Sequence, residues 1–357
     1  MSPSALDEAL RRSYALARCI DYGCLPQDAQ ALHDAVSAGT PWLDTGMALG
    51  EQHERRAQEA GPAEPVRARA ALLAASACYR VAQPALEEEP PARLPLYQRA
   101  VSAFGRALAA DPQVRYLEVR YQGLPHGAWL FAPSQATARP GCVVIWGGAD
   151  GWREAFHGWV SVFHAHGLAV CLTELPGQGL ARLQHGSFLS ERFSGCVSAL
   201  LDALTAAPGV LAGDFAVIGN SMGGSLALRA AADDARVCAC VSNGGSVDLV
   251  AGLTTFPRVL QRICLMLGPS ATPADALRWV EALDLAGASR SMRAEILCVH
   301  GDADPLVQQR EVQALLQLRP DTTVLRWPDG VHCVYNHAAE RNRLVAKWIA
   351  ERLTRNH

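Results

Sequence analysis

The spacing of apolar residues along the chain changes near residue 113. Before that point they recur every three or four positions, as in "ALDEALRRSYALARCI", which is typical of amphipathic helices. Proline and glycine interrupt the pattern and mark the helix ends. We therefore predict an all-helical N-terminal region, residues 1–112, with a loop in "EEEPPARLP" and helices over 5–20, after Pro26, and over 41–61, 64–83 and 96–112.

After residue 113, short apolar runs alternate with helical patterns. Runs such as "CVVIW", "FAVIG" and "ILCVH" are short and end at glycine or polar residues, which predicts buried strands. Strands that alternate with helices indicate a mostly parallel sheet with helices on its faces. The runs "RYLEVRY" and "GAWLFAP" predict a starting hairpin, and residues 246–292 predict a helical cap insertion between the sixth and seventh strands. The predicted α/β domain spans residues 113–357.

Composition and charge indicate which kinds of binding partner are not expected for this chain. The formal net charge is −3, which gives no reason to expect nucleic acid or an anionic membrane surface as a partner. No apolar run approaches the roughly 18 residues that a membrane span needs. The first 20 residues carry early acidic groups and lack the apolar core of a secretory signal, so we expect a cytoplasmic protein.

The chain contains 11 cysteines, and most lie singly among apolar residues, as small core residues do. Cys238 and Cys240 are two positions apart in a predicted strand, so both point to the same side. We favour a buried strand over a metal site there, because no second Cys or His pair shows ligand spacing. The sequence predicts a reduced protein with no metal and no cofactor.

Polar residues follow three of the predicted strands. Ser221 follows "FAVIGN" in the pattern G-x-S-x-G, which either presents a nucleophile at a strand-to-helix turn or is a plain glycine-rich turn. A serine nucleophile needs a base, and the base needs an orienting acid. The carboxyl ends of neighbouring parallel strands meet at one edge of a sheet. An acid after "ILCVHG" and His332 after "TVLRWPDGV" complete the chain order Ser, Asp, His that is typical of α/β-hydrolases.

Two acids and several histidines compete for these roles. In "HGDADP" the pattern H-G-x-x-D favours Asp304 over Asp302, although Asp304 also precedes a proline and fits a helix N-cap. His332 is favoured over its rivals, because His337 and His357 fall in the closing helix and tail. His300 lies within a strand, and we interpret it as a structural neighbour.

The turn around Ser221 also predicts groups that stabilise an oxyanion. Gly219 and Gly223 allow a tight turn on either side of the serine, and Gly224 lets the following helix approach the sheet. The backbone N–H of Met222 is the expected first donor. We expect the second donor at Gly148 or Ala149, in the "GGADGW" loop after the third strand.

The chain from residue 113 onward resembles an α/β-hydrolase. Together with the helical extension, "WGGADGWREAF", "ELPGQG", "GNSMGG", "HGDADPLV" and "DGVHCVYNH" resemble a narrower group: the 2,6-dihydroxypseudooxynicotine hydrolases, the fungal pigment-pathway chain-shortening hydrolases and the fermentation–respiration switch (FrsA-like) esterases. The resemblance implies a Ser–Asp–His triad at Ser221, Asp304 and His332. It also implies cleavage of a C–C bond beside a ketone in several members, a helical extension over the active site, and a homodimer.

An acidic residue near the active site assists some hydrolases of this group. Asp150, Glu154 and Asp248 are the candidates for binding substrate, and each fits a helix cap or a solvated charge equally well. We also expect residues from about 250 to 285 and the N-terminal helices to form a lid above Ser221, because their apolar faces must be buried.

The sequence thus predicts a serine hydrolase that acts on a carbonyl substrate, a small acylated aromatic or polyketide-like compound, through an acyl-enzyme. The bond cleaved is a C–C or ester bond. Alternatives within enzymes are a thioesterase, an acyltransferase or a cyclase of secondary metabolism. An alternative of another class is a ligand-binding protein on a hydrolase scaffold that has lost turnover.

Overall fold

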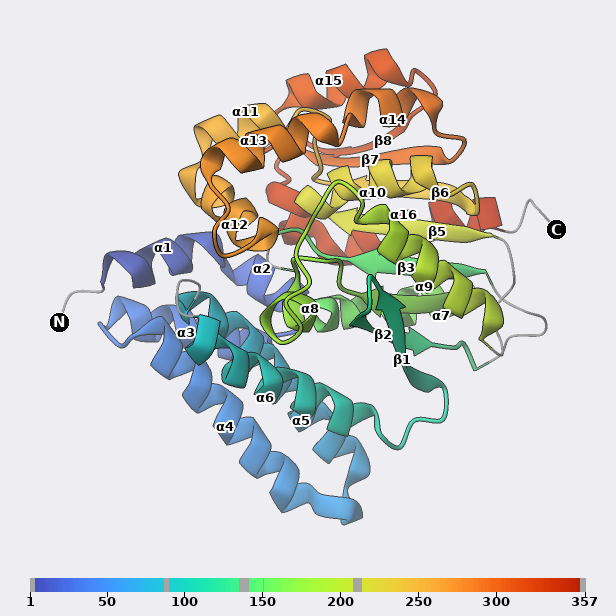
Figure 1. Cartoon of the computed structure of the whole chain (residues 1–357). Helices are drawn as coiled ribbons and strands as arrows, with labels where there is room; N and C mark the ends of the chain where they lie inside the picture. Colours follow the sequence, from blue (N-terminus) through green and yellow to red (C-terminus); the bar gives the residue numbers. More distant parts are fainter. Residues whose placement is uncertain (1–3, 87–89, 135–140, 150, 208–213, 354–357) are drawn as a thin grey trace. The chain divides into compact units, whose positions relative to one another are not determined.

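The computed structural model describes residues 4–86, 90–134, 141–149, 151–207 and 214–353. They divide into two compact units (Figure 1). The helical unit comprises the chain up to Val114 together with Glu154–Gly158. The sheet unit comprises Arg115–Arg153 and the chain from Trp159 onward.

The helical unit differs from the expectation at two helix ends. The single helix predicted over 5–20 is two helices, because Tyr14 leaves the helical region with ψ 57° and Ala15 is extended with ψ 155°. The last helix begins at Pro90 rather than at 96, since proline fits the first turn of a helix, where its missing N–H is not needed. The helices are α1 (Ala5–Ser13), α2 (Leu16–Asp21), α3 (Pro26–Ser37), α4 (Trp42–Ala60), α5 (Pro65–Ala82) and α6 (Pro90–Leu108), with short 3-10 turns at Gly61–Ala63 and Gln83–Leu86.

Helices α4 and α5 pack closely because two glycines face the neighbouring helix. A Cβ on Gly46 would lie 2.7 Å from the Cβ of Ala82, and a Cβ on Gly50 would overlap the ring of Tyr79. Glycine at these two positions therefore lets the two backbones approach, at a helix-propensity cost of about 1 kcal/mol each.

The sheet unit is built on one eight-stranded sheet in the order β1-β2-β4-β3-β5-β6-β7-β8. The strands from β4 and β3 through β8 are parallel, and β2 pairs with β4 in the antiparallel sense. Strands β3, β4 and β5 are buried at every position, as expected for central strands covered on both faces. The strands are β1 (Val114–Tyr121), β2 (Leu124–Phe131), β3 (Cys142–Trp146), β4 (Ala169–Thr173), β5 (Phe215–Asn220), β6 (Val237–Asn243), β7 (Glu295–Gly301) and β8 (Thr323–Trp327).

Helices cover both faces of this sheet (Figure 1). Helix α10 (Met222–Asp233) packs on β5 and β6 and contacts α9 (Ser194–Ala206), whereas α16 (Ala338–Leu353) packs on the same strands and contacts α7 (Val160–His164). Two further helices are α8 (Gly179–Leu183) and α15 (Gln309–Leu318), and 3-10 turns span Arg153–Trp159 and His332–His337.

A helical insertion separates β6 from β7, as the sequence predicts. It consists of α11 (Leu249–Thr255), α12 (Pro257–Leu267), α13 (Pro273–Ala282) and α14 (Leu285–Ser291). Among the described residues, no helix has both the length and the apolar composition to cross a lipid bilayer.

Candidate active site

Ser221 occupies a strained turn between β5 and α10. Its backbone has φ 56° and ψ −133°, a conformation that non-glycine residues rarely adopt and that costs about 1–3 kcal/mol. Glycine is required on both sides of this turn. A Cβ on Gly219 would collide with the carbonyl of Gly223, and a Cβ on Gly223 would collide with the carbonyl of Gly147. The turn thus presents the serine side chain at the carboxyl edge of the sheet.

Two buried asparagines hold the backbone of this turn. The N–H of Ser221 donates to the carbonyl of Asn243 at 2.8 Å. The side-chain amide of Asn243 donates to Asn220 Oδ1 at 2.6 Å, and that of Asn220 donates to the Trp146 carbonyl at 3.1 Å. These bonds join the ends of β3, β5 and β6. No sequence motif distinguishes either asparagine, although each ends an otherwise mostly apolar strand.

A chain of hydrogen bonds connects Ser221 to Asp304 through His332. The Asp304 carboxylate lies with Oδ2 2.7 Å from His332 Nδ1, and His332 Nε2 lies 2.8 Å from Ser221 Oγ. A carboxylate only accepts hydrogen bonds, so Nδ1 carries the ring proton and Nε2 accepts from the serine hydroxyl. The structure brings together the three side chains that the sequence selected at three different strand ends.

Asp304 and Asp302, the two candidates for the acid that orients His332, have different hydrogen-bond and ion-pair partners. Asp304 is buried, and its second oxygen accepts hydrogen bonds from the N–H groups of Leu306 at 2.7 Å and Val307 at 3.1 Å. It therefore caps the following turn and orients the imidazole at the same time. Asp302 turns away and forms an ion pair with Arg326 at 2.6 Å.

An unusual backbone conformation follows His332. Cys333 and Val334 both have positive φ values, 53° and 55°, and a β-branched residue rarely tolerates this region. The fully buried Arg341 donates to the Cys333 carbonyl at 2.6 Å and so stabilises the turn. Arg341 is a supporting residue that no local motif predicts, because it acts from the next helix.

The His332–Asp304 contact shifts both pKa values. Burial alone would raise the pKa of Asp304, but the charge and hydrogen bond of His332 and the two backbone N–H groups lower it below its ordinary value. Burial would lower the pKa of His332, but the adjacent Cys333 and the Asp304 carboxylate raise it above its ordinary value. The carboxylate thus stabilises the protonated form of the His332 ring relative to an isolated histidine.

The loop after β3 lies against the serine turn. A Cβ on Gly148 would come within 2.8 Å of the Ser221 Cβ and 3.1 Å of the Met222 nitrogen, so this backbone passes directly beside both. The buried Gln178 donates its amide to the carbonyls of Gly147 at 2.7 Å and Gly148 at 2.8 Å.

Gln178 thereby orients the peptide groups of this loop. A trans peptide directs its N–H opposite to its C=O, so the N–H groups of Gly148 and Ala149 point away from Gln178. Met222 contributes the first N–H of α10 on the other side of Ser221. The motif "ELPGQG" contains Gln178, but its role becomes visible only when the loop positions are known.

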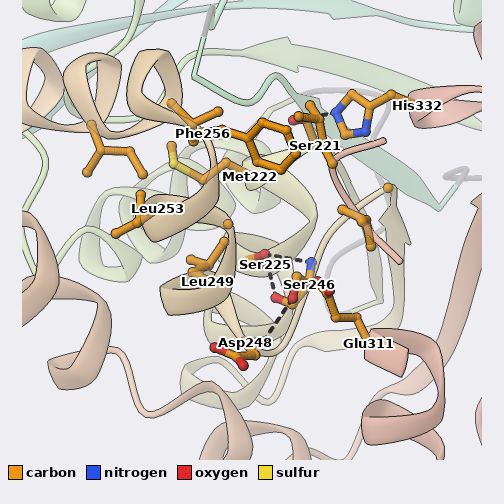
Figure 2. Close-up of a pocket in the computed structure, with 16 residues that line it drawn as sticks. Ser221, Met222, Ser225, Ser246, Asp248, Leu249, Leu253, Phe256, Glu311 and His332 are labelled. Atoms are coloured by element: carbon orange, nitrogen blue, oxygen red, sulfur yellow. Dashed lines mark hydrogen bonds between the residues drawn. The ribbon is translucent and has the colours of Figure 1, made fainter. Parts of the chain in front are cut away.

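A pocket within the sheet unit opens beside Ser221 and His332 (Figure 2). The insertion supplies one wall with apolar side chains, and Phe256 lies close to Met222 and Ser221 in Figure 2. The wall residues are Leu249, Leu253, Phe256, Val259 and Ile263.

The other end of the pocket is polar. The Ser225 hydroxyl donates to the Ser246 carbonyl at 2.6 Å, and the N–H of Asp248 donates to the Ser246 hydroxyl at 2.9 Å. Asp248 and Glu311 also line the pocket (Figure 2). Of the two candidate acids among the described residues, Asp248 and Glu154, Asp248 lines this pocket.

The remaining residues selected from the sequence lie elsewhere or outside the described residues. Glu154 belongs to the helical unit, where its carboxylate accepts a hydrogen bond from Tyr97 at 2.9 Å. His337 is bonded to Asp329 at 2.9 Å, and His300 is buried in β7. Asp150 and His357 lie outside the described residues.

The sheet order and the serine turn at the edge of the sheet define the class of the fold: the chain has the α/β-hydrolase fold. The chain matches no family model. It is similar to the 2,6-dihydropseudooxynicotine hydrolase of Paenarthrobacter nicotinovorans, with 25% identity over 347 residues, which cover 92% of this chain and 91% of that protein. The crystal structure of 2,6-dihydroxy-pseudo-oxynicotine hydrolase has a TM-score of 0.81 at 23% identity, covers 95% of this chain and is itself covered to 96%.

Fungal hydrolases match a shorter part of the chain. The α/β-hydrolase gkaG of Penicillium citrinum is 32% identical over 227 residues, which cover 59% of this chain and 51% of that protein. The chain therefore spans about half the length of this fungal relative. The structure of AbyA5 has a TM-score of 0.72 at 22% identity and covers 92% of this chain and 93% of that one.

Proposed function

We propose that the protein is a serine hydrolase that cleaves a bond next to a carbonyl group through an acyl-enzyme. The observation that carries this proposal is the hydrogen-bonded chain from Ser221 through His332 to Asp304, with contacts of 2.8 and 2.7 Å. A protein that only binds a ligand does not need a serine held in a strained turn, nor a histidine oriented to form a hydrogen bond with that serine.

In the first half of the reaction, Ser221 Oγ attacks the carbonyl carbon while His332 Nε2 accepts the hydroxyl proton. The N–H of Met222 and an N–H of Gly148 or Ala149 stabilise the oxyanion that forms. The bond to the leaving group then breaks, and His332 gives its proton to that group, which is carbon in a C–C cleavage and oxygen in an ester cleavage.

In the second half, His332 takes a proton from water as the water attacks the acyl carbon. The second tetrahedral intermediate releases the carboxylic acid and returns the proton to Ser221 Oγ. Asp304 stays ionised throughout and stabilises the imidazolium that forms in both halves.

The proposed substrate is a small acylated aromatic or polyketide-like compound. The apolar wall of α11 and α12 suits an aromatic or aliphatic group, and the polar end with Ser246, Asp248 and Glu311 suits hydroxyl or amino groups. The bacterial relative is named for its action on a pseudooxynicotine compound, which is consistent with this class. Of the two candidate reactions, we propose cleavage of a C–C bond as the favoured one and cleavage of an ester bond as the alternative.

A fluorophosphonate probe tests the nucleophile. We expect it to label the protein at one serine, and peptide mass spectrometry should place the label on Ser221. Failure to label, with the fold intact by circular dichroism, would favour the ligand-binding alternative. Incubation with aryl 1,3-diketones and with matched aryl esters then distinguishes C–C from ester cleavage by the products. Added thiol or alcohol acceptors reveal acyl transfer.

We also propose that the helical unit and the insertion together cover the pocket as a lid. A fluorophosphonate that carries a benzophenone group, once attached to Ser221, can be photo-crosslinked to its surroundings. We expect crosslinked peptides from residues 5–108 as well as from 246–292. Crosslinks confined to 246–292 would assign the lid to the insertion alone.

A further inference from the structure

Four side chains of metal-binding types converge in the core of the helical unit. Asp28 lies in the first turn of α3, His53 on α4 and Cys78 on α5, and Cys24 precedes α3. All four are buried, with 1–5% of each residue exposed. They come from segments up to 54 positions apart, so no compact sequence motif announces them.

The ligand atoms of this cluster lie close together. Asp28 Oδ2 is 2.7 Å from His53 Nε2 and 4.0 Å from Cys78 Sγ, and the three atoms all lie within 4.8 Å of one another. The Cys24 thiol is a neighbour of the Cys78 thiol and interacts with it electrostatically. Among the described residues, no other set of three His, Cys, Asp or Glu side chains meets in this way.

The ligand atoms of Asp28, His53 and Cys78 lie near three corners of a tetrahedral zinc site, and Cys24 is the candidate for the fourth. With metal–ligand bonds of about 2.0–2.3 Å, the ligand atoms around zinc are separated by about 3.3–3.8 Å. The Asp28–His53 contact would have to open by about 0.6 Å to reach this range, and the Asp28–Cys78 contact would have to close slightly. We propose that Cys24, Asp28, His53 and Cys78 bind one structural zinc ion.

The chemistry of the four groups favours zinc over other divalent cations. Mixed sulfur, nitrogen and oxygen ligands suit zinc, whereas magnesium and calcium prefer oxygen alone.

A buried arginine balances the charge of this site. Zinc with two thiolates and one carboxylate has a net charge of −1. Arg80 is buried, donates to Ser76 Oγ at 2.6 Å and to the Tyr22 carbonyl at 2.7 Å, and interacts electrostatically with Glu154 first and then with Cys24 and Cys78. A buried anionic site needs such a partner, because an uncompensated buried charge is costly. The ion would tie α3, α4 and α5 together.

Metal analysis of the full-length protein, purified without a histidine tag from zinc-supplemented cells, tests the proposal. We expect inductively coupled plasma mass spectrometry to find one zinc ion per chain. Replacement by cobalt should give thiolate-to-cobalt charge-transfer absorption and the visible bands of a tetrahedral site. Dipicolinate should lower the Tm, and added zinc should restore it.

Variants assign the ion to this cluster. C24S, C78S and H53Q should each reduce the zinc content severalfold, whereas C142S, at an equally buried cysteine of β3, should retain one zinc per chain. If the variants do not fold, the zinc and cobalt measurements on the wild-type chain still decide. Wild-type protein without zinc and without a cobalt spectrum would overturn the proposal, as would full zinc retention in C24S and C78S.

Discussion

Two His–Asp pairs among the described residues have the same contact distance and different surroundings. In the sheet unit His332 is bonded to Asp304 at 2.7 Å, and in the helical unit His53 is bonded to Asp28 at 2.7 Å. The first pair uses Nδ1 and leaves Nε2 for Ser221 at a pocket. The second pair uses Nε2 itself, and its neighbours are two cysteine thiols in a closed core.

The difference shows that the pair alone does not define a site. The nitrogen that bonds the acid decides whether the ring can act on a third group. Access to a pocket decides whether that third group can meet a substrate. The first pair therefore predicts effects on turnover, and the second predicts effects on stability and metal content.

The largest expected effect is at the third group of the first pair. Ser221→Ala should lower kcat about 10⁴- to 10⁶-fold, because the nucleophile is lost. The Tm should change little, and the fluorophosphonate label should disappear. Ser291→Ala, at an exposed serine of α14, serves as the control and should keep the wild-type rate. Substantial turnover by Ser221→Ala would place the nucleophile elsewhere.

The acid of the first pair comes next. Asp304→Asn should lower kcat about 10⁴-fold, because an amide favours the wrong imidazole tautomer, as in the serine proteases. Asp302→Asn should cost far less, since Asp302 is paired with Arg326. Equal losses in the two variants, measured with an aryl ester, would contradict the assignment of Asp304.

A substitution in the second pair, His53 and Asp28, should change the stability of the protein. Removing one partner of a buried hydrogen-bonded pair leaves the other partner unsatisfied, which typically costs about 1–3 kcal/mol. His53→Asn should therefore lower the free energy of unfolding by about this amount, as measured by urea denaturation. His332→Asn should lower kcat and leave the free energy of unfolding much closer to that of the wild type. A reversal of these two outcomes would break the comparison.

A smaller effect on turnover is expected at Gln178. Loss of an oxyanion donor typically costs about 10²- to 10³-fold in kcat, and loss of the brace behind the donors should cost less, about 10- to 100-fold. Gln178→Ala should therefore lower kcat more than it raises KM. Gln317→Ala, at an exposed glutamine of α15, should leave both near wild type. An unchanged kcat in Gln178→Ala would show that the loop needs no such support.

The smallest effect is on pH dependence. The base must be neutral, and its pKa is raised, so kcat/KM should rise with pH with a midpoint above the ordinary His value of about 6.5. The stability from this pair is lost as pH falls through the lowered pKa of Asp304 and as it rises through the raised pKa of His332. The Tm difference between wild type and His332→Asn should therefore be largest between those two values. A midpoint at or below the ordinary value would contradict the shift.

Local patterns in the sequence were enough to establish the α/β-hydrolase fold. Buried central strands need continuous apolar runs, and helices need apolar residues at a period of 3.6, so both leave local signals. Ser221, Asp304 and His332 each follow a predicted strand, and the carboxyl ends of parallel strands lie at one edge of a sheet. The sequence therefore predicted that these three side chains lie close together. Local signals were weaker at helix ends: the break at Tyr14 and the start at Pro90 were missed, since ends depend on a few backbone angles.

Only the tertiary structure decided which distant groups meet. Gln178 reaches Gly147 across 31 positions, Asn243 reaches Asn220 across 23, and the 28 positions between Asp304 and His332 are spanned at the sheet edge. The cluster of Cys24, Asp28, His53 and Cys78 forms because three helices and a turn pack around one point. Such contacts depend on how the elements pack, and the residues next to each side chain in the sequence carry no record of that.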